Sequence, residues 1–190
     1  MHAAGLATMA YYYFDFRDVK KQDCYGLLSS LISQLSADSD ACYNILSKLF
    51  SAHIRGTRKP DIDALKECMT DMLSLPGQGP IYIVVDGLDE CPNSSGTPSA
   101  RREVMELIKG FVGLKLRNVY LCVASRPEID IRMLLESLEP LQVSLDDEMG
   151  QKADITAYIE CTVRSYSMPE WTEKDQGLVI HTLSQKANGM

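Results

Sequence analysis

The amino-acid sequence predicts an α/β domain with a mostly parallel β-sheet. Runs of β-branched and aromatic residues alternate along the chain with stretches in which apolar residues recur every three or four positions. Two of the strand-like runs, 81–85 and 119–124, are continuously apolar and are followed by turn-forming or charged residues. Such runs are typical of strands that are buried on both faces of a parallel sheet.

The first half of the chain is expected to form one strand and three helices. The compact aromatic stretch 10–16 predicts the strand. Apolar stripes at helical spacing over 27–35, 45–50 and 62–73 predict the helices, and their leucines and methionines are interpreted as core faces. The segment 38–40, with the letters DSD, offers a cap to the second helix.

The second half continues the alternation. Helices are expected over 104–112 and from about Ile129, and a last strand is expected around 141–145. Two more helices, 155–163 and 178–183, with Trp171 packed between them, indicate the start of a C-terminal helical extension. We therefore expect an α/β domain over 1–150 and the start of the extension over 151–190. Both ends look like cuts, so the chain is interpreted as a fragment of a longer protein.

Composition restricts the classes of function. With 45% hydrophobic and 24% charged residues in 190, the chain has the balance of a soluble globular protein. A net charge of -7 argues against nucleic acid as a partner, and no apolar run approaches the roughly 18 residues that span a bilayer. The apolar N-terminal stretch lacks the basic start of a signal peptide, so a cytoplasmic location is expected. The scattered cysteines and histidines predict buried free thiols and no zinc site.

An acidic segment directly follows the strand at 81–85. Ligands of parallel α/β sheets bind beyond the carboxyl ends of the strands, and Asp86, Asp89 and Glu90 stand at such an end. An apolar strand that carries an aspartate at its tip is the Walker B arrangement, in which the carboxylate holds Mg²⁺ on the phosphates of a nucleotide. We expect Asp86 to take that metal role. Glu90, or alternatively Asp89, is expected to orient the attacking water.

These acids also allow two other interpretations. Acids at a strand end often only cap the next helix or solvate a loop. A carboxylate-based phosphotransferase of the haloacid dehalogenase kind needs D-x-D after its strand, whereas Asp86 and Asp89 are three positions apart. The magnesium interpretation fits the spacing better.

Arg126 follows the next strand and is expected at the same edge of the sheet. A guanidinium can contact the γ-phosphate in a bidentate manner and lose that contact after hydrolysis, which would let Arg126 sense the state of the nucleotide. The alternative is a structural ion pair between Arg126 and Asp86, Glu90 or Glu128. Both interpretations place the guanidinium beside the acids.

Together these blocks resemble the NACHT-type NTPases, which belong to the STAND class of P-loop signalling proteins, and especially their fungal members. The resemblance covers nearly the whole chain and rests on segments 11–16, 81–90, 119–128, 154–159 and 187–190. It implies a P-loop NTPase-like sheet flanked by helices, with ATP or GTP and Mg²⁺ as ligands. It also implies Asp86 on Mg²⁺, Asp89 and Glu90 as the catalytic acidic pair, and Arg126 as the nucleotide sensor.

One part of the family pattern is absent. No G-x-x-x-x-G-K-[ST] phosphate loop occurs in the 190 residues, and the central strand that carries this loop in the family is therefore missing as well. The resemblance implies a nucleotide-dependent switch that controls self-association in innate immunity or programmed cell death. Without the loop, weak or no nucleotide binding is expected of this chain alone. The alternative function is a non-enzymatic interaction or assembly module that contacts other domains of its parent protein.

Overall fold

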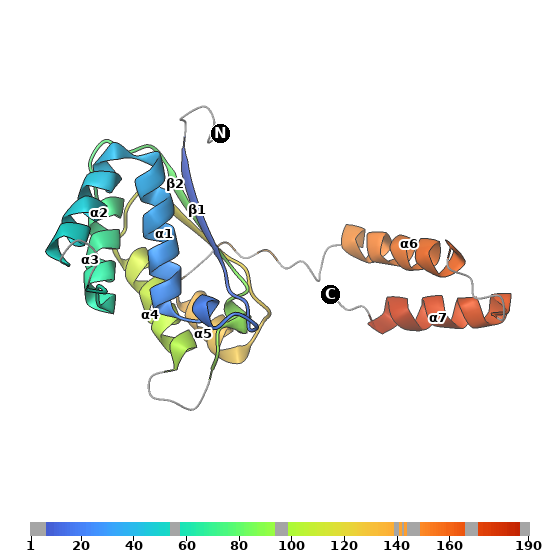
Figure 1. Cartoon of the computed structure of the whole chain (residues 1–190). Coiled ribbons are helices and arrows are strands. Elements are labelled where there is room, and N and C mark those ends of the chain that lie inside the picture. The colour runs from blue at the N-terminus through green and yellow to red at the C-terminus, as the bar shows by residue number, and fades with distance from the viewer. Residues whose placement is uncertain are drawn as a thin grey trace. The chain divides into compact units, whose positions relative to one another are not determined.

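The structure is a computed structural model, and it describes residues 7–53, 58–93, 99–138, 141, 143, 149–165 and 171–186. The chain forms two compact units, 1–139 and 140–190, which are described separately. In its described part, the first unit contains a three-stranded sheet and the helices α1 to α5 (Figure 1). The second contains α6 and α7.

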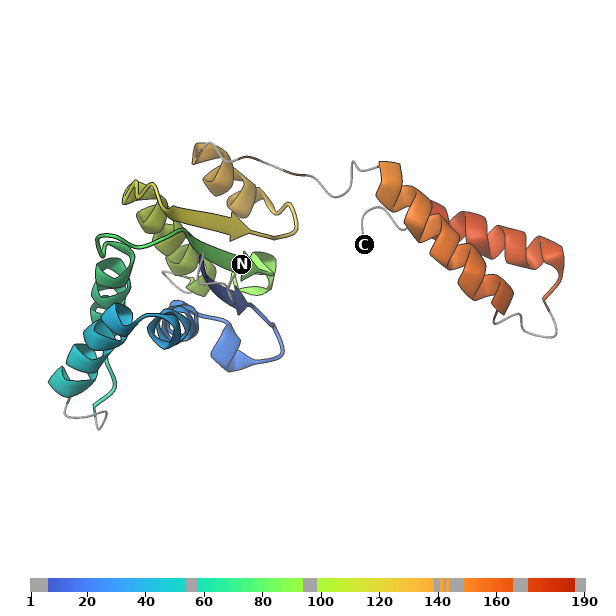
Figure 2. The ribbon, with the colours of Figure 1, turned by 90° about the horizontal axis from the view of Figure 1, so that it is seen from above.

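The sheet of the first unit is entirely parallel. Its strands are β1 (Thr8–Tyr13), β2 (Ile81–Asp86) and β3 (Val119–Val123), and they lie side by side in that order (Figure 2). The register pairs Thr8 with Ile81 and Ile81 with Val119. Both crossovers between these strands contain helices, as parallel pairing requires. The predicted α/β class with a parallel sheet and flanking helices is confirmed.

Side-chain caps mark where four of the five helices begin. The helices are α1 (Cys24–Asp38), α2 (Asp40–Ala52), α3 (Ile62–Leu73), α4 (Ala100–Gly113) and α5 (Ile129–Ser137). The side chains of Asp23, Ser39, Asp61 and Ser99 each accept a hydrogen bond from a backbone N–H of the first turn of α1 to α4, respectively. The predicted cap within 38–40 is therefore Ser39.

Within the described part of the first unit, helices cover one face of the sheet and leave the other face exposed. Alternate residues of β1 and β2 point into a core that they share with α1, α3 and α4, namely Ala10, Tyr12, Ile81, Ile83 and Val85. The residues between them point to the other face, which exposes Met9, Tyr11, Tyr13 and Tyr82 together with Tyr120 of β3. The expectation of strands buried on both faces is therefore wrong for the described residues. Tyr82 and Tyr120 stack across the strands, with ring centroids 5.0 Å apart.

The strand predictions differ from the structure at both ends of the α/β unit. β1 ends at Tyr13 rather than at residue 16, because Asp18 caps a short 3-10 helix, η2 (Val19–Lys21), and the chain turns away from the sheet. Of the strand expected around 141–145, only Leu141 and Val143 are described, and neither lies in a strand. The other residues of that segment lie outside the described part.

The second unit is a pair of helices that contact each other, α6 (Met149–Ser165) and α7 (Glu173–Lys186). A reciprocal cap starts α7: Thr172 N–H donates to Asp175 Oδ2 at 2.9 Å, and Asp175 N–H donates to Thr172 Oγ1 at 3.3 Å. Trp171, which we expect to pack between these helices, is 39% exposed. No described helix combines the length and the apolar character needed to cross a membrane.

Candidate functional site

The carboxyl ends of the three strands are joined by backbone hydrogen bonds. Phe14 N–H donates to Asp86 O at 3.0 Å, and Ala124 N–H donates to Val85 O at 2.9 Å. Leu88 N–H, just beyond β2, donates to Ala124 O at 3.3 Å. The loops that leave β1, β2 and β3 are therefore held at one edge of the sheet, where ligands of parallel α/β proteins bind.

Asp86 is the last residue of β2 and is half-buried. It follows Tyr82 and Val84 on the open face of the sheet, because alternate residues of a strand share a face. Among the described residues, no donor hydrogen-bonds the Asp86 carboxylate and no cation pairs with it. A carboxylate without a partner at a ligand-binding edge is available to a metal or to a polar ligand.

Gly87 lets the chain turn sharply after Asp86. Its φ is 68°, in the left-handed region that residues with a side chain rarely adopt. A Cβ at this position would also lie 3.3 Å from the backbone oxygen of Phe14. The turn leads into the 3-10 helix η3 (Leu88–Glu90), which carries both remaining acids.

Asp89 and Arg126 are brought together. The Asp89 carboxylate, whose side chain is 11% exposed, accepts hydrogen bonds from Arg126 N–H at 3.0 Å and from Ser125 Oγ at 3.3 Å. Arg126 Nε lies 3.6 Å from Asp89 Oδ2, while the guanidinium side chain is 85% exposed. Arg126 thus pairs with Asp89 and not with Asp86, Glu90 or Glu128. The contact anchors the loop after β3 to η3.

Glu90 contacts the loop after β1. Its Oε2 accepts a hydrogen bond from Phe16 N–H at 3.2 Å. In that loop Asp15 holds Arg17 through bonds of 3.0 and 3.2 Å to the guanidinium, and these bonds lower the pKa of the Asp15 carboxyl. Glu90 and Asp89 therefore both hold neighbouring loops in this state, and Asp86 is the acid that stays free.

Arg101 is the functional neighbour that the sequence analysis missed. It lies in the first turn of α4, is only 5% exposed, and donates from Nε to Cys91 O at 2.8 Å and from Nη2 to Asp89 O at 2.5 Å. Its Nη1 bonds to Glu128 and lies 3.5 Å from Asp130 Oδ2 at the start of α5. The guanidinium therefore fixes the backbone of the acidic segment.

A signal for Arg101 existed in the sequence. Position 101 falls on the same helical face as Val104, Ile108 and Phe111, all of which are buried. A cation on an apolar stripe indicates a buried polar contact, because a guanidinium is not buried without acceptors. What the sequence could not reveal was which acceptors the fold would bring to it.

Cys91 follows the acidic segment but is not a nucleophile in this state. Its thiol is buried, and Sγ donates to Gln22 O at 3.1 Å. Burial raises the pKa of this thiol to about 12, so the reactive thiolate is scarce at neutral pH. The carboxylates and Arg126 therefore remain the candidate functional groups at this edge.

The described residues contain no group of three or more histidine, cysteine, aspartate or glutamate side chains that would hold a metal by themselves. Mg²⁺ does not require such a cage, because it keeps several waters and is usually bound by one or two carboxylates together with the phosphates of its substrate. The free carboxylate of Asp86 fits this kind of site.

Comparison with models of known protein families gave a match that covers most of the α/β unit. A family model described as "Nephrocystin 3, N-terminal" matches residues 2–126, which include β1 to β3, the acidic segment and Arg126. No curated protein and no solved structure gave a significant match. The family is a NACHT-associated N-terminal region, in agreement with the resemblance to NACHT-type proteins noted from the sequence.

Proposed function

The chain belongs to the nephrocystin 3, N-terminal family, and from this premise we propose that it is part of a NACHT-related nucleotide switch. In the proposed role, Asp86 carries Mg²⁺ and the intact parent protein binds and hydrolyses ATP or GTP. The nucleotide state controls assembly in a signalling process such as innate immunity or programmed cell death. The observation that carries the proposal is the unpartnered Asp86 carboxylate at the end of β2.

The proposed roles follow from the contacts at the sheet edge. Mg²⁺ at Asp86 would neutralise charge on the β- and γ-phosphates. Arg126 is close enough to Asp89 to be held near that site, yet its side chain is solvent-exposed and can exchange Asp89 for a phosphate. Such an exchange would remove the guanidinium contact of Asp89 while the bonds from Ser125 Oγ and Arg126 N–H hold the loop after β3, and it would report that nucleotide is bound.

Glu90 is proposed to orient the attacking water. Its carboxylate is held by a single hydrogen bond, from Phe16 N–H, which is worth about 1.5–3 kcal/mol because the acceptor is charged, so a rearrangement of the loop after β1 can release the carboxylate. Arg101 acts on the same segment as a positioning residue, because it holds the backbone oxygens of Asp89 and Cys91. The phosphate contacts that this chain lacks would come from the parent protein.

The test uses a longer form of the protein that carries a phosphate loop. We expect Asp86→Ala to weaken Mg²⁺-dependent nucleotide binding at least about tenfold, and Glu90→Gln to keep binding but slow hydrolysis by roughly 10²-fold. Glu106→Gln, an exposed acid of α4, is the matched control. Unchanged binding and hydrolysis in the Asp86 and Glu90 variants would refute the assigned roles.

A second candidate is a non-enzymatic interaction or assembly module. It is favoured by the open aromatic face of the sheet and by the structural engagement of both Asp89 and Glu90. Calorimetric titration of this 190-residue chain with ATP and Mg²⁺ separates the two candidates. Micromolar binding would count against the module, and the absence of a detectable heat of binding would favour it.

A further inference from the structure

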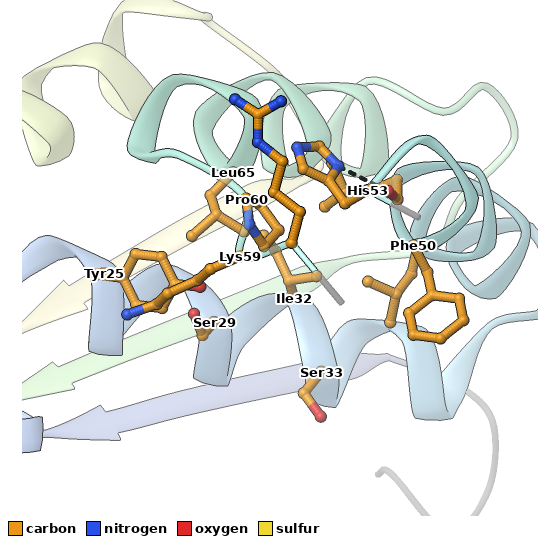
Figure 3. A pocket seen from close by; sticks show the side chains of 12 residues that line it. Tyr25, Ser29, Ile32, Ser33, Phe50, His53, Lys59, Pro60 and Leu65 are labelled. Carbon is orange, nitrogen blue, oxygen red and sulfur yellow. Dashed lines mark hydrogen bonds between the residues drawn. The ribbon is translucent and has the colours of Figure 1, made fainter. Parts of the chain in front are cut away.

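A pocket lies on the helical layer of the first unit. It has a volume of about 460 Å³ and is formed by α1, α2 and the segment that leads into α3 (Figure 3). Its inner wall is apolar and consists of Ile32, Leu46, Leu49 and Leu65. The volume falls in the range of pockets that hold small organic ligands or a few side chains.

The rim of this pocket is basic. Arg58, Lys59 and His53 line it together with the hydroxyl groups of Ser29 and Ser33. Within the part of the chain that the structure describes, no acidic side chain lines the pocket, and neither Arg58 nor Lys59 forms an ion pair. Two adjacent unpaired cations are notable in a chain that carries 26 acidic residues and a net charge of -7.

Contacts within the chain hold two of the rim side chains, those of Lys59 and His53, in place. Lys59 Nζ lies 3.7 Å from the centroid of the Tyr25 ring, which holds the ammonium over the pocket wall by a cation–π contact (Figure 3). His53 Nδ1 is 2.8 Å from Leu49 O, so the imidazole is fixed to the end of α2. Arg58 N–H donates to His53 O at 3.2 Å, which places the arginine beside the histidine.

We propose that this pocket binds a ligand in which a carboxylate is joined to an apolar body. The body would fill the space against Ile32, Leu46 and Leu65, and the carboxylate would meet Arg58 and Lys59. A guanidinium fork matches the planar carboxylate, and the single negative charge costs less to desolvate than a phosphate does at a pocket with apolar walls. Two sources share this chemistry, a free organic acid and an acidic residue next to an apolar residue in a peptide.

The experiment compares 4-phenylbutyrate with its neutral analogue 4-phenylbutanamide on the full 190-residue chain, by titration followed with ¹H–¹⁵N spectra. The carboxylate should bind at least about tenfold more tightly than the amide, because only the carboxylate forms charge-assisted hydrogen bonds. The largest shifts should fall at residues 25–33, 46–50 and 58–65. Equal affinity of the two compounds, or no binding of either, overturns the proposal.

A double variant locates the binding. Arg58→Ala together with Lys59→Ala should reduce the affinity for 4-phenylbutyrate to that of the amide, while Lys48→Ala should leave it unchanged. All three side chains are exposed, so the variants should fold normally, and Lys48 lies on α2 without lining the pocket. An equal effect of the control, or no effect of the double variant, overturns the proposal.

A titration with a peptide distinguishes between a free organic acid and a peptide segment as the ligand. Acetyl-Asp-Phe-amide presents the same carboxylate and aromatic body within a polypeptide backbone. Binding tighter than that of 4-phenylbutyrate supports a peptide segment as the ligand, and weaker binding supports a free acid. Asp86→Asn should leave both affinities unchanged, since the pocket residues do not include the strand-end site.

Discussion

The side-chain amide of Gln34 in α1 hydrogen-bonds both backbone groups of Tyr11 in β1. Gln34 Oε1 accepts from Tyr11 N–H at 3.0 Å, and Gln34 Nε2 donates to Tyr11 O at 2.8 Å. The amide takes the place that a further strand would occupy, so β1 closes the sheet on this side. In the described part of the chain β3 pairs only with β2, which leaves the opposite edge of the sheet open.

The open edge predicts concentration-dependent self-association. β3 is short, uncharged and apolar, and such edges are templates for pairing with another strand. Tyr120→Lys should raise the dissociation constant of the self-associated form by about tenfold, because a lysine on an edge strand opposes pairing. Light scattering coupled to gel filtration measures the effect. Tyr43→Lys, at an exposed position of α2, is the control, and a wild-type chain that stays monomeric at high concentration would contradict the prediction.

Arg101 is predicted to stabilise the first unit. Arg101→Ala should lower the free energy of unfolding by about 1–3 kcal/mol, because the buried oxygens of Cys91 and Asp89 lose their donors. Arg101→Lys should recover only part of this loss, since an ammonium cannot reproduce the fork. Urea denaturation measures both variants. Arg102→Ala, at the exposed neighbouring position, should change stability by less than about 0.5 kcal/mol; equal effects at 101 and 102 would contradict the assignment.

Two glycines should respond in opposite directions to alanine. Gly87→Ala should destabilise the chain by roughly 1–2 kcal/mol, because the left-handed φ and the nearby Phe14 oxygen both oppose a Cβ. Gly113→Ala, at the end of α4 with no atom within 4 Å of the added Cβ, should stabilise it by about 0.5–1 kcal/mol. Thermal unfolding followed by circular dichroism compares them, and a neutral Gly87→Ala variant would show that the turn tolerates side chains.

Features that depend on contacts between neighbouring residues in the sequence could be predicted, and features that depend on contacts between distant residues could not. The helices followed from local periodicity, and Asp86 was placed correctly at a strand end because the run 81–85 ends there. The open face was not predictable, because a strand with aromatic residues on its exposed side has the same continuously apolar sequence as a strand that is buried on both faces. Tyr82, for example, is 40% exposed. The Asp89–Arg126 and Arg101–Glu128 pairs join residues 37 and 27 positions apart, and no local pattern encodes such partners.

Buried thiols predict a loss of stability at alkaline pH. Burial raises the pKa of Cys24 from 9.0 to about 12 and that of Cys68 to about 11, so the folded state keeps their protons above pH 9 while the unfolded state loses them. Stability from these groups is complete below pH 9 and falls by up to about 1.4 kcal/mol per pH unit and thiol as the pH rises toward the folded values. Urea titrations at pH 8 to 10.5 measure the slope, which Cys24→Ala should make shallower.

The same burial predicts how the thiols react. Below pH 9 a thiol reagent should modify two cysteines rapidly in the folded protein, and the others only after unfolding. The exposed thiols are those of Cys122 and Cys161, and the buried ones are those of Cys24, Cys42, Cys68 and Cys91. Cys122→Ser should remove one rapid equivalent. Rapid modification of four or more cysteines would mean that the core opens readily. Burial of the thiols would then not explain the loss of stability at alkaline pH.

Neutralising each of the two aspartates of the acidic segment in turn should change the stability of the chain by different amounts. Asp89→Asn should lower the free energy of unfolding by about 1–3 kcal/mol, because its carboxylate holds Arg126 N–H, Ser125 and the Arg126 guanidinium. Asp86→Asn should leave stability unchanged or raise it slightly, since no described group pairs with the Asp86 carboxylate and the chain is already acidic. Urea denaturation without nucleotide makes this comparison independent of any ligand. If Asp86 serves only to bind a ligand, its neutralisation should not lower the free energy of unfolding. An Asp86→Asn variant as unstable as Asp89→Asn would therefore assign Asp86 a structural role instead.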